Sequence, residues 1–180
     1  MSVDPALKDL MLAALPNLRA FAISLTGSGD RADDLVQDTI MRAWANIDRF
    51  QPGTNMNAWL FTILRNLFHS EYRKRRREVE DSDGAFAGRL KTQPDQQDRL
   101  DFDDFRSALA KLPVDQREAL LLIGAQGMAY EEAAAICGVA VGTIKSRVNR
   151  ARTRLAQLLH LENDADLGPD QVTKAALAAE

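Results

Sequence analysis

Apolar residues recur at intervals of three and four along most of the chain, and no segment alternates apolar and polar residues as a β-strand does. This pattern predicts an all-α protein. The helical spacing fades over residues 78–99, where acidic residues outnumber basic ones. We therefore expect two small helical domains, 1–77 and 100–160, joined by a flexible acidic linker over 78–99 and followed by an acidic tail over 161–180.

The first domain is expected to begin with a helix at Pro5, because Asp4 is a good N-cap and proline suits the first helical position. Pro16 either kinks this helix or begins a second one. The glycine-containing segment Thr26–Asp30 predicts a turn, and Asp30 is expected to cap the helix that follows.

Two further helices of the first domain are predicted from their apolar faces. The face of the earlier helix consists of Leu35, Val36, Ile40, Ala43, Trp44 and Ile47. A polar loop, Phe50–Asn57, follows, and Asn57 is expected to cap the next helix. The apolar face of that helix consists of Trp59, Leu60, Ile63, Leu64, Leu67 and Phe68. We expect the aromatic residues Trp59, Phe61 and Phe68 to pack in the core.

The second domain is predicted to contain a helix-turn-helix. Pro113 separates one helix from another over Val114–Ile123. Tyr130–Ile136 predicts a short helix, Gly138 suits the left-handed residue that ends it, and a longer helix is expected to begin near Val141. A short helix, a glycine turn and a second helix form the arrangement of many DNA-binding domains.

The helix that begins near Val141 is expected to have one buried and one basic face. At about 100° per residue, the apolar residues that fall together are Val141, Ile144, Val148, Ala151 and Leu155. The opposite side presents Lys145, Ser146, Asn149, Arg150 and Thr153. Between Val141 and Leu155 five residues are basic and none is acidic, although the whole chain has a net charge of −3. A basic stripe is often only a solvated surface, but serine and asparagine in this stripe favour contact with DNA.

The composition excludes several kinds of chemistry. One cysteine, Cys137, cannot form an internal disulfide, and together with two histidines it makes no metal cluster. We find no nucleophile–base pair and no phosphate-binding loop, so we expect neither an enzyme nor a cofactor or metal. The N-terminus lacks a signal-peptide pattern, and the longest apolar run, Ala119–Ala125, is too short to span a membrane. We therefore expect a cytoplasmic protein without a membrane segment.

Four segments, in this order, resemble the extracytoplasmic-function sigma factors of bacterial RNA polymerase. They are ADDLVQDTIMRAW (32–44), NAWLFTILRNLFHSEYRKRRR (57–77), LPVDQREALLL (112–122) and GVAVGTIKSRVNRAR (138–152). The resemblance covers about residues 10–160, and the stretch from Asp30 to Asn66 is most similar to the general-stress subgroup of alphaproteobacteria. It implies a transcription initiation factor whose two domains correspond to sigma regions 2 and 4.

The resemblance implies that the first domain docks on the clamp helices of the largest subunit of core RNA polymerase. The residues that match the docking segment of the family are Asp33, Asp34, Leu35, Gln37, Asp38, Met41 and Arg42. Acidic residues in the first turn of a helix also interact favourably with the helix dipole, which is an alternative reason for their presence.

The resemblance also implies that both domains contact promoter DNA. In the first domain the residues that match the −10 recognition and melting segment are Thr54, Asn55, Asn57, Arg65, Arg73, Lys74, Arg75 and Arg76. In the second domain a −35 element similar to GGAAC would be contacted by Lys145, Ser146, Arg147, Asn149 and Arg150.

A regulatory partner is implied as well. Members of the stress subgroup are held by a small helical anti-sigma protein, which a phosphorylated response regulator releases.

The linker is implied to pass toward the catalytic cleft of the polymerase, where its carboxylates either resemble RNA phosphates or act only as a solvated tether. Two other functions are considered: a sigma-like decoy that binds only an anti-sigma protein, and an autonomous helix-turn-helix regulator.

Overall fold

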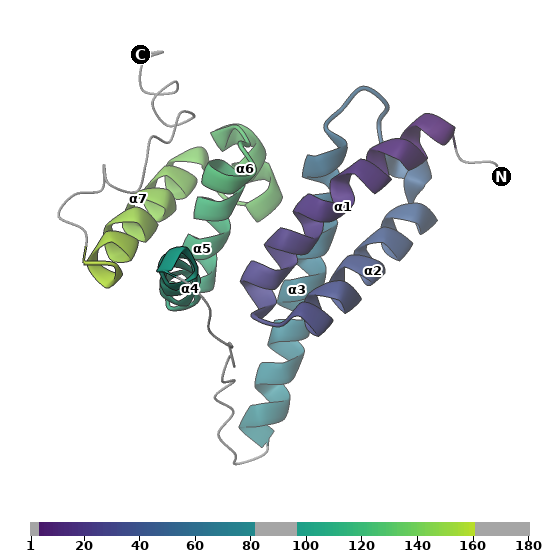
Figure 1. Cartoon of the computed structure of the whole chain (residues 1–180). Coiled ribbons are helices and arrows are strands. Elements are labelled where there is room, and N and C mark those ends of the chain that lie inside the picture. Colours follow the sequence, from purple (N-terminus) through teal and green to yellow (C-terminus); the bar gives the residue numbers. More distant parts are fainter. Residues whose placement is uncertain (1–3, 82–96, 161–180) are drawn as a thin grey trace, which may run out of the picture. The chain divides into compact units, whose positions relative to one another are not determined.

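The computed structural model describes residues 4–81 and 97–160, which form helices and the turns between them (Figure 1). Within these two ranges no β-strand occurs, and the all-α prediction is confirmed. The chain divides into two compact units, Met1–Thr92 and Gln93–Glu180, each with its own buried apolar residues. The expected tail and most of the expected linker lie outside the described residues.

Within residues 4–81, unit 1 consists of three long helices and one short turn of 3-10 helix. These elements are α1 (Pro5–Thr26), α2 (Gly29–Ala45), the 3-10 turn (Ile47–Arg49) and α3 (Met56–Asp81). Asp4 caps α1 as expected, because its Oδ1 accepts a hydrogen bond of 3.0 Å from the N–H of Ala6. α1 continues through Pro16, so no second helix starts there. α3 runs past residue 77 into the segment expected to be linker.

The start of α2 differs from the prediction. Gly27 adopts the left-handed conformation, with φ of 69°, and ends α1. Ser28 then caps α2, since its Oγ accepts a hydrogen bond of 3.5 Å from the N–H of Arg31. Asp30, the predicted cap, lies inside the first turn. Several residues of this turn are able to cap a helix, and the position of the left-handed glycine decides which of them does so.

The start of α3 also lies earlier than predicted. Asn55 Oδ1 accepts a hydrogen bond of 3.2 Å from the N–H of Ala58, and α3 begins at Met56. Asn57, the predicted cap, is therefore a residue of the first helical turn. Both asparagines are chemically able to cap, and only the path of the chain distinguishes them.

Replacing the two asparagines one at a time tests this assignment. Asn55→Ala is expected to lower the free energy of unfolding of unit 1 by about 1 kcal/mol, because a helix N–H loses its acceptor. Asn57→Ala is the matched control and should cost less than about half of that, because alanine is favourable inside a helix. Both tryptophans of the chain, Trp44 and Trp59, lie in unit 1, so urea unfolding followed by tryptophan fluorescence reports on this unit alone. Equal losses would contradict the assignment.

The three helices of unit 1 pack against one another around a common apolar core. Phe21 of α1 and Phe61 of α3 meet edge to face in this core, with ring centroids 4.9 Å apart. Phe61 and Phe68 are buried as expected, whereas Trp59 is only half-buried. This core fixes the three helices relative to one another and so positions the side chains on their outer faces.

Trp44 does not belong to the core, and its predicted place on the buried face of α2 is wrong. Its side chain is 46% exposed, whereas the buried residues of α2 are Ala32, Leu35, Thr39 and Ala43. At about 100° per residue, Trp44 lies more than about 90° away from this buried stripe. The predicted face included Ala43 but omitted Ala32 and Thr39, and the hydroxyl of the buried Thr39 donates to the carbonyl oxygen of Leu35 at 2.7 Å.

Over residues 97–160, unit 2 consists of four helices and a wider helical turn. They are α4 (Gln97–Ala110), α5 (Val114–Leu120), a π-helical turn (Leu121–Ala125), α6 (Tyr130–Cys137) and α7 (Val141–Leu158). The predicted helix over 114–123 thus continues, with a widened last turn, to Ala125. None of the helices in 4–81 and 97–160 is long and apolar enough to cross a bilayer.

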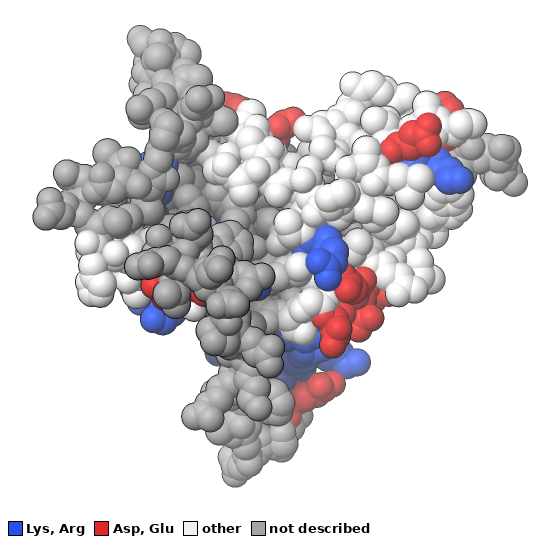
Figure 2. Space-filling view, in the orientation of Figure 1, with Lys and Arg blue, Asp and Glu red and all other residues white. Residues whose placement is uncertain are grey.

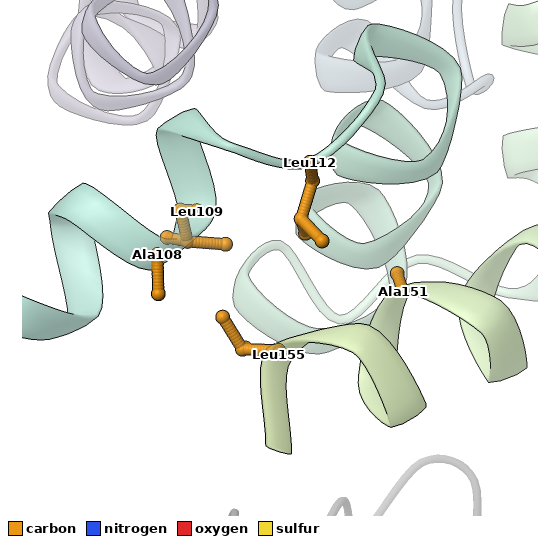
Figure 3. Packing of buried hydrophobic residues seen from close by; sticks show 5 residues of the cluster. All are labelled: Ala108, Leu109, Leu112, Ala151 and Leu155. Carbon is orange, nitrogen blue, oxygen red and sulfur yellow. The ribbon is translucent and has the colours of Figure 1, made fainter. Parts of the chain in front are cut away.

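α4 is joined to α7 by a cluster of buried apolar side chains. Figure 3 shows them pointing toward one another: Ala108, Leu109 and Leu112 on one side, Ala151 and Leu155 of α7 on the other. α5 packs along α7 as well. α7 is therefore held on its apolar side by the rest of unit 2, and Cys137, at the end of α6, is buried as expected.

The turn between α4 and α5 is fixed by a buried arginine. Arg117 is only 8% exposed, and its Nη2 donates hydrogen bonds to the carbonyl oxygens of Ala110 at 3.3 Å and Leu112 at 3.0 Å. Burial lowers the pKa of Arg117, and the charge of the fully buried Glu118 acts in the opposite direction. Arg117 thereby ties the start of α5 to the end of α4.

Candidate nucleic-acid and protein interfaces

α6 and α7 form the predicted helix-turn-helix. Gly138 ends α6 in the left-handed conformation, with φ of 66°, and α7 begins three residues later at Val141. Neither Ala129 before α6 nor Ala140 before α7 provides a side-chain cap. Glu132 partly compensates in α6, because its Oε2 accepts a hydrogen bond of 3.2 Å from the N–H of Ala129.

α7 separates its apolar and polar residues as the sequence predicts. Its inner face is buried and consists of Ile144, Val148, Ala151, Leu155 and Ala156, with Val141 half-buried. The exposed residues of its outer face are Lys145, Asn149, Arg150, Thr153 and Arg154, and Ser146 is half-buried. The buried side anchors α7 in unit 2, and the polar side is left at the surface of that unit.

Lys145 and Arg147 differ in their surroundings although both are basic residues of α7. Lys145 is exposed, and its Nζ lies 5.8 Å from the centroid of the Tyr130 ring of α6, a cation–π contact that leaves the ammonium group at the surface. Arg147 turns toward α5, where its Nε lies 3.3 Å from Asp115 Oδ2, and its side chain is 21% exposed. Sequence reasoning grouped the two residues together and did not detect the carboxylate opposite Arg147.

A shallow groove of about 370 Å³ runs between α5 and the outer face of α7. It is lined by Gln116, Asn149, Arg150, Thr153, Arg154 and Gln157. Gln116 was not singled out from the sequence, yet its Oε1 is buried and has no hydrogen-bond partner within the described structure. Polar side chains of two helices thus converge beside the residues expected to contact the −35 element.

In unit 1 the predicted −10 loop is partly held by its own polar groups. The Thr54 hydroxyl donates to the carbonyl oxygen of Gln51 at 2.7 Å, and Asn55 is engaged as the cap of α3. The rings of Phe50 and Trp59, 5.2 Å apart, fasten the loop to α3. Thr54 and Asn55 are exposed and Asn57 is half-buried.

The basic residues of α3 do not form one uniform surface. Arg65 is half-buried near the middle of the helix, whereas Arg73–Arg77 are exposed in its C-terminal part. Lys74 and Arg75 line a polar groove of about 500 Å³ between α2 and α3. The other residues that line this groove are Arg31, Asp34, Gln37, Asp38, Glu71 and Glu78. Lys74 and Arg75 of the predicted −10 set therefore line the same groove as three residues of the predicted docking set. These three are Asp34, Gln37 and Asp38.

The predicted docking residues of α2 are mostly exposed. Exposed side chains are those of Asp33, Asp34, Gln37, Asp38, Met41 and Arg42. Leu35 is an exception: it is 1% exposed and packs in the core, so it cannot contact a partner directly. Asp33 is paired with Arg19 of α1 at 2.6 Å, and the hydrogen bond to Asp33 raises the pKa of Arg19.

An exposed aromatic residue beside this surface was missed by sequence reasoning. Met41 is 63% exposed, and Trp44, one helical turn further along α2, is 46% exposed. Residues three apart on a helix are neighbours on its surface. The structure, by burying Thr39 and Ala43, places the core stripe of α2 away from Trp44. In residues 4–81 and 97–160 we find no group of histidine, cysteine, aspartate and glutamate side chains that could hold a metal ion.

Both units match models of known protein families. The family Sigma-70 region 2 matches residues 10–78, which include α2, the loop and most of α3. The family Sigma-70, region 4 matches residues 102–155, which include α5, α6 and most of α7.

Individual proteins match nearly the whole chain. The ECF RNA polymerase sigma factor EcfG of Rhodopseudomonas palustris is 64% identical over 177 residues, which cover 98% of each chain. The ECF RNA polymerase sigma factor SigC of Mycobacterium tuberculosis is 36% identical over 170 residues, covering 93% of this chain and 86% of the relative. Among solved structures, the sigma factor RpoE in complex with the anti-sigma factor NepR from Bartonella quintana is 59% identical with a TM-score of 0.79, covering 87% of this chain and 98% of that one.

Proposed function

The chain belongs to the extracytoplasmic-function sigma factors of RNA polymerase, and we propose that each of its two units contacts a different promoter element. As a member of this family it is a transcription initiation factor and not an enzyme. It binds core RNA polymerase and directs it to promoter DNA. The residues that make these contacts, and the site of action in the cytoplasm, are part of the proposal.

In unit 2 the outer face of α7 recognises the −35 element in the major groove. Lys145, Ser146, Asn149 and Arg150 contact base edges and nearby phosphates. The observation that supports this assignment is the separation of the two faces of α7, with an apolar side buried and these polar side chains at the surface. Arg147 has a smaller role in recognition, because its guanidinium is engaged with Asp115 and fixes α7 against α5.

In unit 1 two surfaces act on different partners. The exposed residues of α2, namely Asp34, Gln37, Asp38, Met41 and Arg42, dock on the clamp helices of the largest polymerase subunit. The loop residues Thr54 and Asn57, with the basic residues Arg65, Arg73 and Arg76, contact the −10 strand. Asn55 contributes by capping α3, and Leu35 and Asp33 by holding α2 in place.

An anti-sigma protein is the proposed regulator. The supporting comparison is the Bartonella quintana sigma factor, which was solved in complex with the anti-sigma factor NepR. We propose that a homologous small anti-sigma protein holds this chain inactive until a stress signal releases it. Affinity purification of the tagged chain from unstressed cells should recover such a protein. Recovery of core polymerase alone under these conditions would contradict the proposal.

Run-off transcription with purified core polymerase tests the function directly. Core polymerase with this chain is expected to transcribe a template that has an intact −35 element, and core polymerase alone is not. Replacing the −35 element while keeping the −10 element should abolish the transcript, because unit 2 then loses its base contacts. Tight binding of the chain to promoter duplex in the absence of polymerase would instead favour an autonomous regulator. Binding to the anti-sigma protein without any transcript would favour a decoy.

A further inference from the structure

The groove between α2 and α3 is lined on both sides by charges of both signs. α2 contributes the carboxylates Asp34 and Asp38, while α3 contributes the cations Lys74 and Arg75 together with the carboxylates Glu71 and Glu78. Arg31, at the start of α2, also lines it. Figure 2 shows basic and acidic side chains side by side over the part of unit 1 where α2 and the C-terminal part of α3 lie in Figure 1. The groove is thus a surface of mixed charge.

Helical periodicity divides the basic run of α3 between two faces. Glu71, Lys74, Arg75 and Glu78 follow the spacing of i, i+3, i+4 and i+7, which places them on one face of the helix, and all four line the groove. Arg73 lies about 150° and Arg77 about 110° away from the centre of that face. Neither of these two residues lines the groove. The run Arg73–Arg77 therefore does not act as one patch.

Arg31 has a donor in the groove that lacks an acceptor. Its side chain is half-buried, and its Nε is shielded from solvent with no hydrogen-bond partner in the described structure. The pKa of Arg31 is lowered, first by burial and then by the charge of Arg75, while Glu71 acts in the opposite direction. A buried donor without an acceptor is unfavourable, and an acceptor brought by a partner would remove that cost.

We propose that Arg31, Lys74 and Arg75 belong to the polymerase-docking surface and not to the DNA-binding surface. The groove accepts a segment of core polymerase that presents a carboxylate to these three cations and a basic side chain to Asp34 and Asp38. This inference rests on the proposed docking through α2 and extends the docking surface onto α3. A DNA strand fits less well, because its phosphates would also face the carboxylates that line the same groove.

Two pairs of substitutions that remove the same charge from the same helix test the proposal. Lys74→Gln with Arg75→Gln neutralises the groove side, and Arg73→Gln with Arg77→Gln neutralises the opposite side. The first quantity to measure is the affinity of the labelled chain for core polymerase without DNA. The groove pair is expected to weaken it about tenfold, and the opposite pair by less than about twofold.

The second quantity is the salt dependence of holoenzyme binding to promoter DNA. Each lost phosphate contact lowers the slope of log K against log salt by about 0.7–0.9. The opposite pair is expected to lower this slope, and the groove pair is expected to leave it unchanged. If the groove pair lowers the slope and leaves core affinity intact, the inference is overturned and these residues contact DNA.

The variant Asp34→Asn with Asp38→Asn separates failure of the inference from failure of the proposed function. If it weakens core binding but the groove pair does not, docking through α2 stands and its extension onto α3 is wrong. If neither variant weakens core binding, the proposed docking surface itself is wrong. Circular dichroism checks the fold of each variant, and should a pair unfold, Lys74→Gln alone against Arg73→Gln alone gives the same comparison.

Discussion

Arg150→Ala is expected to lower promoter discrimination at one position of the −35 element by about 1–3 kcal/mol, a factor of about 5–150. The arginine is exposed on the outer face of α7 and lines the groove beside Asn149. When its guanidinium contacts a base edge, the loss is confined to that base pair. Transcription from templates with single substitutions along the −35 element measures the effect, and with the variant one position should become permissive.

Arg154→Ala is the matched control for this prediction. Arg154 is exposed on the same helix, one turn after Arg150, and lies outside the residues proposed to contact bases. Its loss should weaken binding to all templates by a similar factor and reduce the salt dependence, as expected for a phosphate contact. A uniform loss with Arg150→Ala as well, on every promoter and on random DNA, would show that Arg150 contacts only phosphate.

Arg117→Leu is expected to destabilise unit 2 by about 3 kcal/mol. The substitution leaves the carbonyl oxygens of Ala110 and Leu112 without their donor, and it removes a positive charge beside the buried Glu118. Because α5 packs along α7, the recognition helix should lose support as well. Hydrogen exchange of the amides of α5 and α7 measures the local stability.

Two internal references make this stability measurement specific. Tryptophan fluorescence follows unit 1, and its unfolding midpoint should not change when only unit 2 is destabilised. Lys111→Leu, an exposed position in the same turn, should change the stability of unit 2 by less than about 0.5 kcal/mol. A comparable effect of the two substitutions would contradict a special role for Arg117.

The sequence was sufficient to predict the helical units and the inner face of α7. Helical periodicity depends on burial, and in α7 the large apolar residues Ile144, Val148 and Leu155 define the buried side without ambiguity. In α2 the same reasoning failed for Trp44, because the helix buries small residues and a threonine that donates to its own backbone. Periodicity is informative where large apolar side chains mark the core and weak where small ones do.

Contacts between helices were beyond the reach of sequence reasoning. The pairing of Arg147 with Asp115 and the position of Lys74 and Arg75 opposite Asp34 depend on which helix faces come together. Spacing along one helix does not contain this information. The helix caps are a similar case, since Ser28 and Asn55 are chosen over Asp30 and Asn57 by the path of the chain into each helix. The types of residue at each interface can be recognised in the sequence. The surface to which each of these residues belongs is decided by how the helices pack in the fold.

Photocrosslinking from α7 tests the central claim, that the polar face of this helix lies against the −35 element. A photoreactive p-benzoyl-phenylalanine in place of Asn149, which is exposed on that face, is compared with the same group in place of Asp104, which is exposed on α4. With core polymerase and promoter DNA present, the group at position 149 is expected to crosslink to bases of the −35 element, and the group at 104 is not. Crosslinking of position 149 to polymerase or to unit 2 itself, with none to DNA, would contradict the account.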